Sequence, residues 1–284
     1  MDSATAEAED NSPESAMRGD ALTEAYAALT RGDKAAIPQV VAAIDRQRSA
    51  QPDNPYAVFY AGAFRLWQLA ENLDLGAAQG VLDNLERAHE LLPDDFRVTG
   101  FYGLSQVIIG GFGDPALLDA GLQTLEHGVD QQSTYGHFLR ATAVSTLSST
   151  HPAFKTALSD MEGVGPDCMV EIGAEGIYHY PTDPTVDRPR VCTNDGIVPH
   201  AWEGYFASFG DIALKAGESA ERARALYRSA MTAPTYKDWP FKQLLEQRID
   251  AAEANAAAFA DANPLNDPGT WALSGNICVA CHQK

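Results

Sequence analysis

The chain has 284 residues, enough for one large or two modest domains, and 45 % of these residues are hydrophobic. Its formal net charge of -19 and pI of about 4.6 argue against nucleic acid and anionic membrane surfaces as partners, because both would repel an acidic protein. The charge balance favours a basic or neutral partner, or simply a well-solvated surface.

Residues 1–19 are rich in Ala, Glu, Asp and Ser and predict a disordered acidic tether. They show neither the basic start nor the apolar centre of an export signal. Nowhere does the chain reach the roughly 18 consecutive apolar residues that a membrane span needs.

Apolar residues recur at helical spacing through most of residues 20–262, which we assign to one helical domain. In 77–92, for example, Val81, Leu85 and Leu92 would share one face. Short clusters of Pro, Gly and Asp separate such stretches and are typical of helix ends. We predict helices over 36–44, 58–69, 77–92, 98–109, 117–129, 138–147, 200–216, 219–231 and 241–262.

An internal repeat runs through the first half of this domain. Pro52-Asp53 recurs 41 positions later as Pro93-Asp94, and Leu85-Glu86 recurs 40 positions later as Leu125-Glu126. Gly62 likewise recurs as Gly103. A helix pair of this length cannot bury its own apolar face, so we predict an all-α fold in which antiparallel helix pairs stack into a solenoid.

Two segments, 88–95 and 223–231, resemble the second helix of a tetratricopeptide repeat. The resemblance covers about half of the chain and implies a tetratricopeptide-like solenoid. The period exceeds the roughly 34 residues usual for that family, and the full consensus is absent. A generic stack of antiparallel helices is the alternative.

Between residues 163 and 199 the pattern changes to a Gly- and Pro-rich stretch that predicts one long irregular loop. Such long loops are usually functional or cross-linked. Cys168 and Cys192 lie near its ends, and in an exported protein they would form a disulfide. Closing this loop would stabilise the fold by about 3 kcal/mol. Two buried free thiols are the alternative.

The C-terminal segment, 263–284, ends in two cysteines three positions apart with a histidine directly after the second: Cys278, Cys281 and His282. This is the attachment signature of a c-type haem. Two thiols on one helical turn can bond the two vinyl groups of the porphyrin, and the next imidazole then ligates the iron as proximal ligand. We therefore predict one covalent haem c.

Two other chemistries use similar residues. A zinc site would need a distant fourth donor, and no second Cys-x-x-Cys pair is present. A redox dithiol would begin a helix in a β-α-β context, and no parallel-sheet pattern accompanies this one.

The segment around the motif resembles the haem-attachment segment of c-type cytochromes: Asn276-Ile277-Cys278-Val279-Ala280-Cys281-His282-Gln283. Class I cytochromes place this motif early in their fold, and the four-helix cytochromes c′ form a much shorter bundle. The resemblance therefore implies the cofactor, while the preceding helices would pack the haem. We expect Trp271, seven residues before Cys278, beside the porphyrin.

The distal iron ligand would normally be a histidine or a methionine. His200, at the start of an aromatic-rich helix, is the first candidate, followed by His179 and Met169; an open site is the alternative. His127 and His137 are expected on the surface of repeat helices.

These observations predict a monohaem electron-transfer protein in the periplasm or another extracytoplasmic compartment, where haem is attached. Its partner would be a redox protein with a basic patch, docked on the helical scaffold. Contact with a membrane would require a lipid anchor that had been removed. An oligomer in which subunits share haems across an interface is also compatible with the sequence. The alternatives are a peroxidase-like haem enzyme or small-ligand sensor with an open distal site, a structural haem, and a zinc-binding scaffold.

Overall fold

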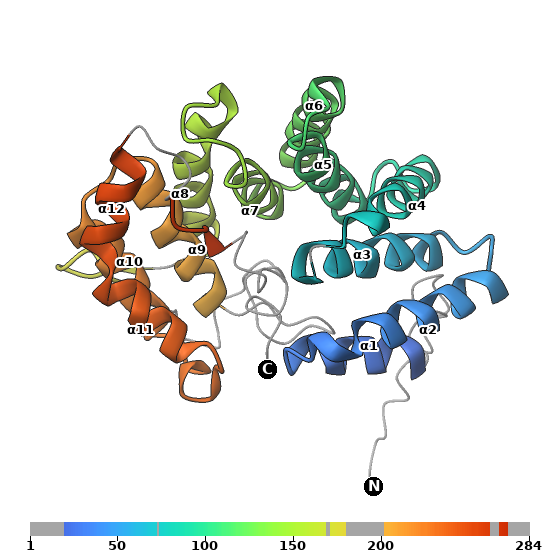
Figure 1. Cartoon of the computed structure of the whole chain (residues 1–284), viewed down its shortest axis with the longest axis horizontal. Helices are drawn as coiled ribbons and strands as arrows, with labels where there is room; N and C mark the ends of the chain where they lie inside the picture. The colour runs from blue at the N-terminus through green and yellow to red at the C-terminus, as the bar shows by residue number, and fades with distance from the viewer. Residues whose placement is uncertain (1–19, 73, 169–170, 180–201, 262–266, 272–284) are drawn as a thin grey trace, which may run out of the picture.

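The computed structural model describes residues 20–72, 74–168, 171–179, 202–261 and 267–271 (Figure 1). These residues form twelve α-helices and one two-stranded antiparallel sheet, which confirms the all-α fold. The helices are α1 (Asp20–Thr30), α2 (Ile37–Ala50), α3 (Pro55–Asn72), α4 (Ala78–Leu91), α5 (Phe96–Gly110), α6 (Pro115–Gln131), α7 (Ser133–Val144), α8 (Ala157–Asp167), α9 (Trp202–Lys215), α10 (Ala220–Ala230), α11 (Lys242–Asp250) and α12 (Ala252–Ala260). Short 3₁₀ helices are η2 (Lys34–Ala36), η3 (Leu75–Ala77), η4 (Pro152–Thr156) and η6 (Tyr236–Asp238).

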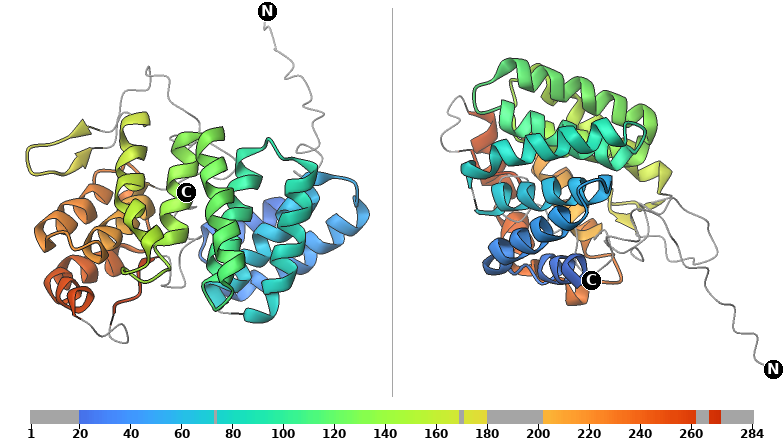
Figure 2. Two further views of the ribbon diagram at one scale, coloured as in Figure 1. Left: turned by 90° about the horizontal axis from the view of Figure 1, so that it is seen from above. Right: turned by 90° about the vertical axis from the view of Figure 1, so that its right-hand side faces the viewer.

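Consecutive helices pack side by side, most extensively α3 with α4, α5 with α6, and α9 with α10. The stack follows an arc from α1 and α2, through α5 to α7, to α9 to α12 (Figures 1 and 2). One continuous apolar core runs through the whole stack. No helix within the described ranges is long and apolar enough to cross a membrane.

The helix starts repeat with the period seen in the sequence. Asp33, Asp74 and Asp114 precede the second helices of successive pairs, and each carboxylate accepts a backbone N–H of the turn that follows. Asn54 and Asp95 cap α3 and α5 in the same way, 41 residues apart. The repeat is therefore built from equivalent caps as well as equivalent apolar positions.

Equivalent glycines also bring the paired helices close together. A Cβ atom on Gly62 of α3 would lie 2.6 Å from Leu85 Cγ of α4, and one on Gly103 of α5 would lie 2.8 Å from Leu125 Cγ of α6. Both contacts are closer than real Cβ atoms allow, so only glycine permits this helix spacing. The Gly and Leu positions of the sequence repeat are the two sides of one repeated interface.

Two predicted boundaries are wrong. The irregular loop does not begin at residue 163, because α8 continues to Asp167. Met161, Val164 and Cys168 lie at helical spacing and are buried, and this packing overrides the unfavourable glycines and proline of the last turn. The predicted helix 241–262 is two helices, α11 and α12, separated at Ala251, whose ψ is 1°. Nearby, the Arg224 side chain donates to the Ile249 carbonyl at 3.2 Å.

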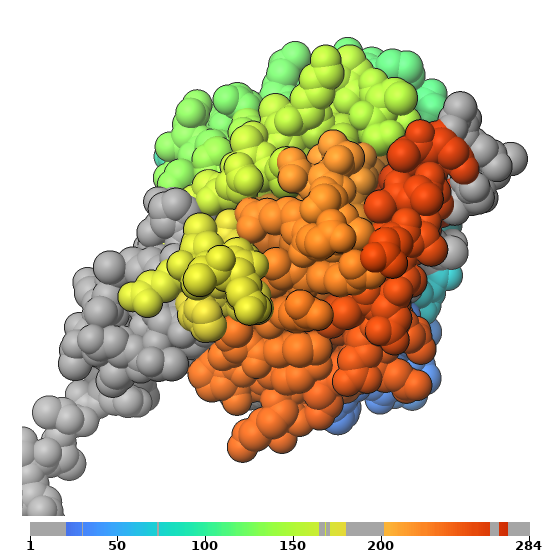
Figure 3. All heavy atoms as spheres, turned by 90° about the vertical axis from the view of Figure 1, so that its left-hand side faces the viewer, coloured from blue at the N-terminus to red at the C-terminus, as the bar shows by residue number. Residues whose placement is uncertain are grey.

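Part of the predicted loop forms a hairpin of β1 (Glu171–Ile172) and β2 (Tyr178–His179). The hairpin lies on α10 (yellow and orange in Figure 3). The Tyr178 N–H donates to Ser229 Oγ at 2.8 Å, and Thr232 Oγ1 donates to the Tyr178 carbonyl at 3.1 Å. The irregular character of the loop beyond residue 179 lies outside the described residues, as does the tether of residues 1–19.

We predict that Gly103→Ala lowers the free energy of unfolding by about 1–3 kcal/mol, because the new methyl group overpacks the α5–α6 interface. Gly128→Ala, in α6 of the same interface, is the matched control: its Cβ would meet neighbours at 3.8 Å or more. Since alanine is the better helix former, this control should be neutral or slightly stabilising. Urea unfolding followed by circular dichroism measures both, and equal destabilisation would contradict the interpretation.

Candidate functional site

The segment that leads to the Cys-x-x-Cys-His motif is anchored to the helical body at residues 267–271. Trp271 is fully buried and Thr270 is 2 % exposed. The Trp271 ring stacks on Trp239 with centroids 5.7 Å apart and meets Phe241 edge-on at 6.2 Å. The guanidinium of Arg248 lies 4.6 Å from the same ring, in cation–π contact.

A buried carboxylate, Asp211 of α9, holds this anchor in place. Its oxygens accept hydrogen bonds from Arg248 Nε of α11 at 3.0 and 3.1 Å and from Tyr227 Oη of α10 at 2.7 Å. The backbone N–H of Trp271 also donates to it, and Arg248 reaches the Gly269 carbonyl at 3.3 Å. We call Asp211, Tyr227, Arg248 and Trp271 the anchor cluster.

Burial shifts the pKa values of both acidic groups of the anchor cluster, Asp211 and Tyr227. Burial raises the pKa of Asp211, and Arg248, Tyr227 and the Trp271 N–H oppose this shift. Burial raises the pKa of Tyr227 well above its ordinary value, and the neighbouring Asp211 adds to this increase.

The anchored segment runs antiparallel to α9. Asp267, at its start, acts electrostatically on Lys215, the last residue of α9, whose pKa is lowered chiefly by burial. At its end, the backbone N–H of Trp271 donates a hydrogen bond to Asp211, which lies one helical turn before Lys215 in α9. The segment therefore heads from the C-terminal towards the N-terminal end of α9, and Figure 1 shows it in red close to this helix.

The anchor limits where the motif can lie. Cys278 lies seven positions after Trp271, and a fully extended chain of that length spans at most about 25 Å. Cys278 is therefore tethered within that reach of Trp271.

The N-terminal half of α9 is lined with aromatic side chains. Trp202 meets Tyr205 edge-on at 5.2 Å, and Tyr205 contacts Phe138 of α7 at 6.1 Å. Glu203, in the same turn, is fully buried. Its Oε1 accepts a hydrogen bond from Thr235 at 2.7 Å, and its Oε2 has no hydrogen-bond partner among the other described side chains. Burial raises the pKa of Glu203, and the Thr235 hydrogen bond opposes this shift.

The predicted site residues fall into two groups. Cys278, Cys281 and His282 lie outside the described residues, as do His200, Met169 and Cys192. Trp271 lies inside them: its ring is enclosed by protein side chains, and its contact with a porphyrin stays a prediction. Cys168 is buried and disulfide-bonded, and its pairing with Cys192 stays a prediction. His179 is exposed on β2.

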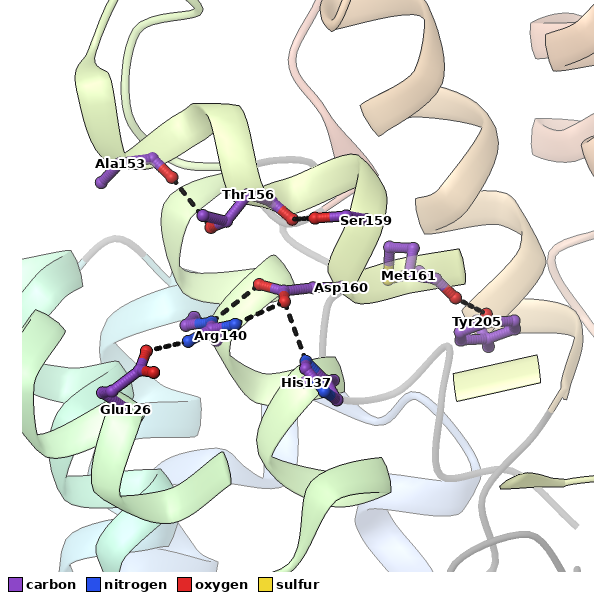
Figure 4. Close-up of polar contacts among 9 residues, drawn as sticks. All are labelled: Glu126, His137, Arg140, Ala153, Thr156, Ser159, Asp160, Met161 and Tyr205. Atoms are coloured by element: carbon purple, nitrogen blue, oxygen red, sulfur yellow. Dashed lines mark hydrogen bonds and ion pairs between the residues drawn. The ribbon is translucent and has the colours of Figure 1, made fainter. Parts of the chain in front are cut away.

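His137 differs from its expected surface position. Its side chain is only 26 % exposed, and Nδ1 lies 2.8 Å from Oδ1 of Asp160, which is 2 % exposed. Arg140 bonds to both oxygens of the same carboxylate (Figure 4). The sequence could not reveal this group, because Asp160 lies 23 positions after His137 and only the packing of α7 on α8 brings them together.

Comparison with protein-family models, curated proteins and solved structures finds no match to this chain. Within the described ranges, no three or more His, Cys, Asp or Glu side chains form a group that could hold a metal ion.

We predict that Trp271→Ala lowers the free energy of unfolding by about 3–5 kcal/mol, since a fully buried indole is removed from the anchor cluster. Phe112→Ala serves as control, because Phe112 is 69 % exposed, and should change stability little. Chemical unfolding gives both values. A Trp271 variant as stable as the control would show that the segment is not held by its indole.

We predict that Glu203→Gln raises the melting temperature at neutral pH. Because the pKa of Glu203 in the folded protein is raised above its ordinary value of 4.5, the folded protein keeps a proton that the unfolded chain loses as pH increases. Above the folded-state pKa the buried carboxyl is charged, and its burial lowers the free energy of unfolding. Well below pH 4.5 it is protonated in both states, and this cost disappears. The advantage of the glutamine variant should shrink as the pH falls towards 4.

Calorimetric melting curves at pH 4 and pH 8 test this dependence. Glu218→Gln, at an exposed glutamate after α9, should show the same melting temperature as the unaltered protein at each pH. A pH-independent difference between Glu203→Gln and the unaltered protein would rule out titration of Glu203 as the cause.

Proposed function

We propose that this protein is a monohaem c-type cytochrome that exchanges electrons with a protein partner. The observation that carries the proposal is the sequence Cys278-Val279-Ala280-Cys281-His282. Two thiolate sulfurs and an imidazole at this spacing suit a porphyrin with two vinyl groups and an iron. The two cysteines would form the thioether bonds, and His282 would be the proximal ligand.

The anchor cluster supports the proposal in one respect that matters for electron transfer. A haem on a freely moving terminus would have no defined distance to a partner, whereas the anchor cluster ties the chain to the helical body seven residues before Cys278. When bound, the haem supplies a one-electron couple. The protein supplies its tether and, through the helical stack, a surface for the partner.

The charge of the chain supports a particular kind of partner. A net charge of -19 attracts a protein with a basic patch and speeds its encounter at low ionic strength. Stacked helix pairs provide extended surfaces for such docking. Because haem is attached to Cys-x-x-Cys-His motifs outside the bacterial cytoplasm, the proposal includes a periplasmic or other extracytoplasmic location.

The experiment is expression with export to the periplasm of a host that matures c-type cytochromes, followed by a pyridine haemochrome assay. We expect one covalent haem per chain, and we expect none in Cys278→Ala/Cys281→Ala. Cys192→Ser, which leaves the motif intact, should keep the haem. Zinc in the purified protein with no haem would contradict the proposal and favour a zinc-binding scaffold.

A further inference from the structure

A hydrogen-bond network links α6 to the turn between α4 and α5. The side-chain amide of Gln131, the last residue of α6, donates to the Pro93 carbonyl at 2.8 Å, and its nitrogen lies 3.1 Å from Nε2 of His127. Thr99 Oγ1 of α5 donates to the same carbonyl at 3.4 Å and lies 3.4 Å from Nδ1 of His89, in the last turn of α4. We call these five residues the imidazole junction.

The contacts of the imidazole junction determine where its protons lie. A carbonyl oxygen only accepts, so Gln131 presents its NH₂ group, and Nε2 of His127 must then accept and carry no proton. The Thr99 hydroxyl donates its one proton to Pro93, so its oxygen accepts from Nδ1 of His89. The network therefore requires a neutral ring at His127, and it places the single proton of a neutral His89 on Nδ1.

His89 lies in surroundings that disfavour a charge. Its ring packs on Tyr102 of α5 with centroids 5.4 Å apart, and burial and, second, the nearby His127 lower its pKa. On α6, a Cβ atom at Gly128 would lie 3.8 Å from Thr99 Cγ2, so α6 runs close beside the residue that His89 contacts. A positive charge on His127 therefore acts directly on His89.

The elements around the imidazole junction also carry other charged and titratable groups: Glu86, Arg87 and Glu90 of α4, Asp94 of the turn, Arg97 and Tyr102 of α5, Glu126 and Asp130 of α6, and Arg140 of α7. Glu90 pairs with Arg87 at 2.8 Å, and Glu126 pairs with Arg140. Carboxylates near an imidazole favour its charged form, whereas burial disfavours it. Because the pKa of His89 is lowered, burial and His127 outweigh the carboxylates at this position.

We propose that the imidazole junction is a pH-sensitive latch between the α3–α4 and α5–α6 helix pairs, closed when both rings are neutral and open when they are protonated. A proton on Nε2 of His127 opposes the N–H of Gln131, so the amide must leave either the ring or the Pro93 carbonyl. The two charged rings also repel each other. Opening removes the polar link between α6 and the α4–α5 turn and leaves the apolar contacts of the helices in place.

The direction of the pH dependence follows from His89. Its pKa in the folded protein is lower than the ordinary 6.5, so the unfolded chain binds a proton first as the pH falls. The stabilisation by the closed latch is therefore complete above pH 6.5 and decreases as the pH falls from 6.5 to the folded-state pKa.

The test is hydrogen–deuterium exchange of the full chain at pH 7.5 and pH 5.5, read by mass spectrometry and corrected for the intrinsic exchange rate at each pH. Peptides that cover the α4–α5 turn and the C-terminal end of α6 should lose protection about fivefold at pH 5.5, which corresponds to one hydrogen bond. Peptides from α2 are the internal reference and should keep their protection.

A double variant, His89→Asn/His127→Gln, keeps the hydrogen-bonding groups without the charge. The asparagine amide replaces Nδ1–H of His89, and the glutamine carbonyl replaces the Nε2 acceptor of His127. This variant should keep the protection of the closed latch at both pH values, whereas Gln131→Ala should show the lower protection at both.

His151→Asn is the control, because it removes an imidazole outside the latch and its amide oxygen can still accept the Ala153 N–H that Nδ1 accepts now. It should respond to pH as the unaltered protein does. Absence of the response from the unaltered protein, or its persistence in the double variant or in Gln131→Ala, would overturn the proposal.

Discussion

The packing of the C-terminal half depends on the hydrogen bonds that the buried carboxylate of Asp211 accepts. It joins α9 to α10 through Tyr227, to α11 through Arg248 and to the terminal segment through the Trp271 N–H. A charge buried in a low-dielectric interior is tolerated only when its partners are in place, and removal of one partner leaves an uncompensated charge. The four segments are therefore positioned together.

Helix α9 connects this cluster to the rest of the stack. Lys215 at its C-terminal end donates to the carbonyls of Ser145 and Leu147, which follow α7, at 2.9 and 2.6 Å. Near its N-terminal end, Tyr205 contacts Phe138 of α7 and donates to the Met161 carbonyl of α8. Movement of α9 would disturb both the core and the anchor, so the terminal segment is attached to one of the most constrained elements of the molecule.

The proposed function divides the holding of the cofactor between two parts of the chain. The segment with the Cys-x-x-Cys-His motif would contribute the covalent bonds and the proximal ligand, whereas the helices that precede it would contribute the surroundings. The repeat architecture suits this division, because each helix pair packs mainly on its neighbours and leaves its outer surfaces available. The net negative charge of the chain would act over a longer range, on the approach of the proposed partner.

The sequence alone determined the features that arise from local spacing: the helices of the repeat, the period of 40 to 41 residues that relates Gly62 to Gly103 and Leu85 to Leu125, and the chemistry expected of Cys278, Cys281 and His282. Tertiary structure decided the features that depend on contacts between helices. Packing of Met161 and Val164 carries α8 through a Gly- and Pro-rich turn. The pairs Asp211–Arg248 and His137–Asp160 join residues 37 and 23 positions apart. Such pairs leave no periodic signal, because a side chain finds its partner only after the helices that carry both have packed.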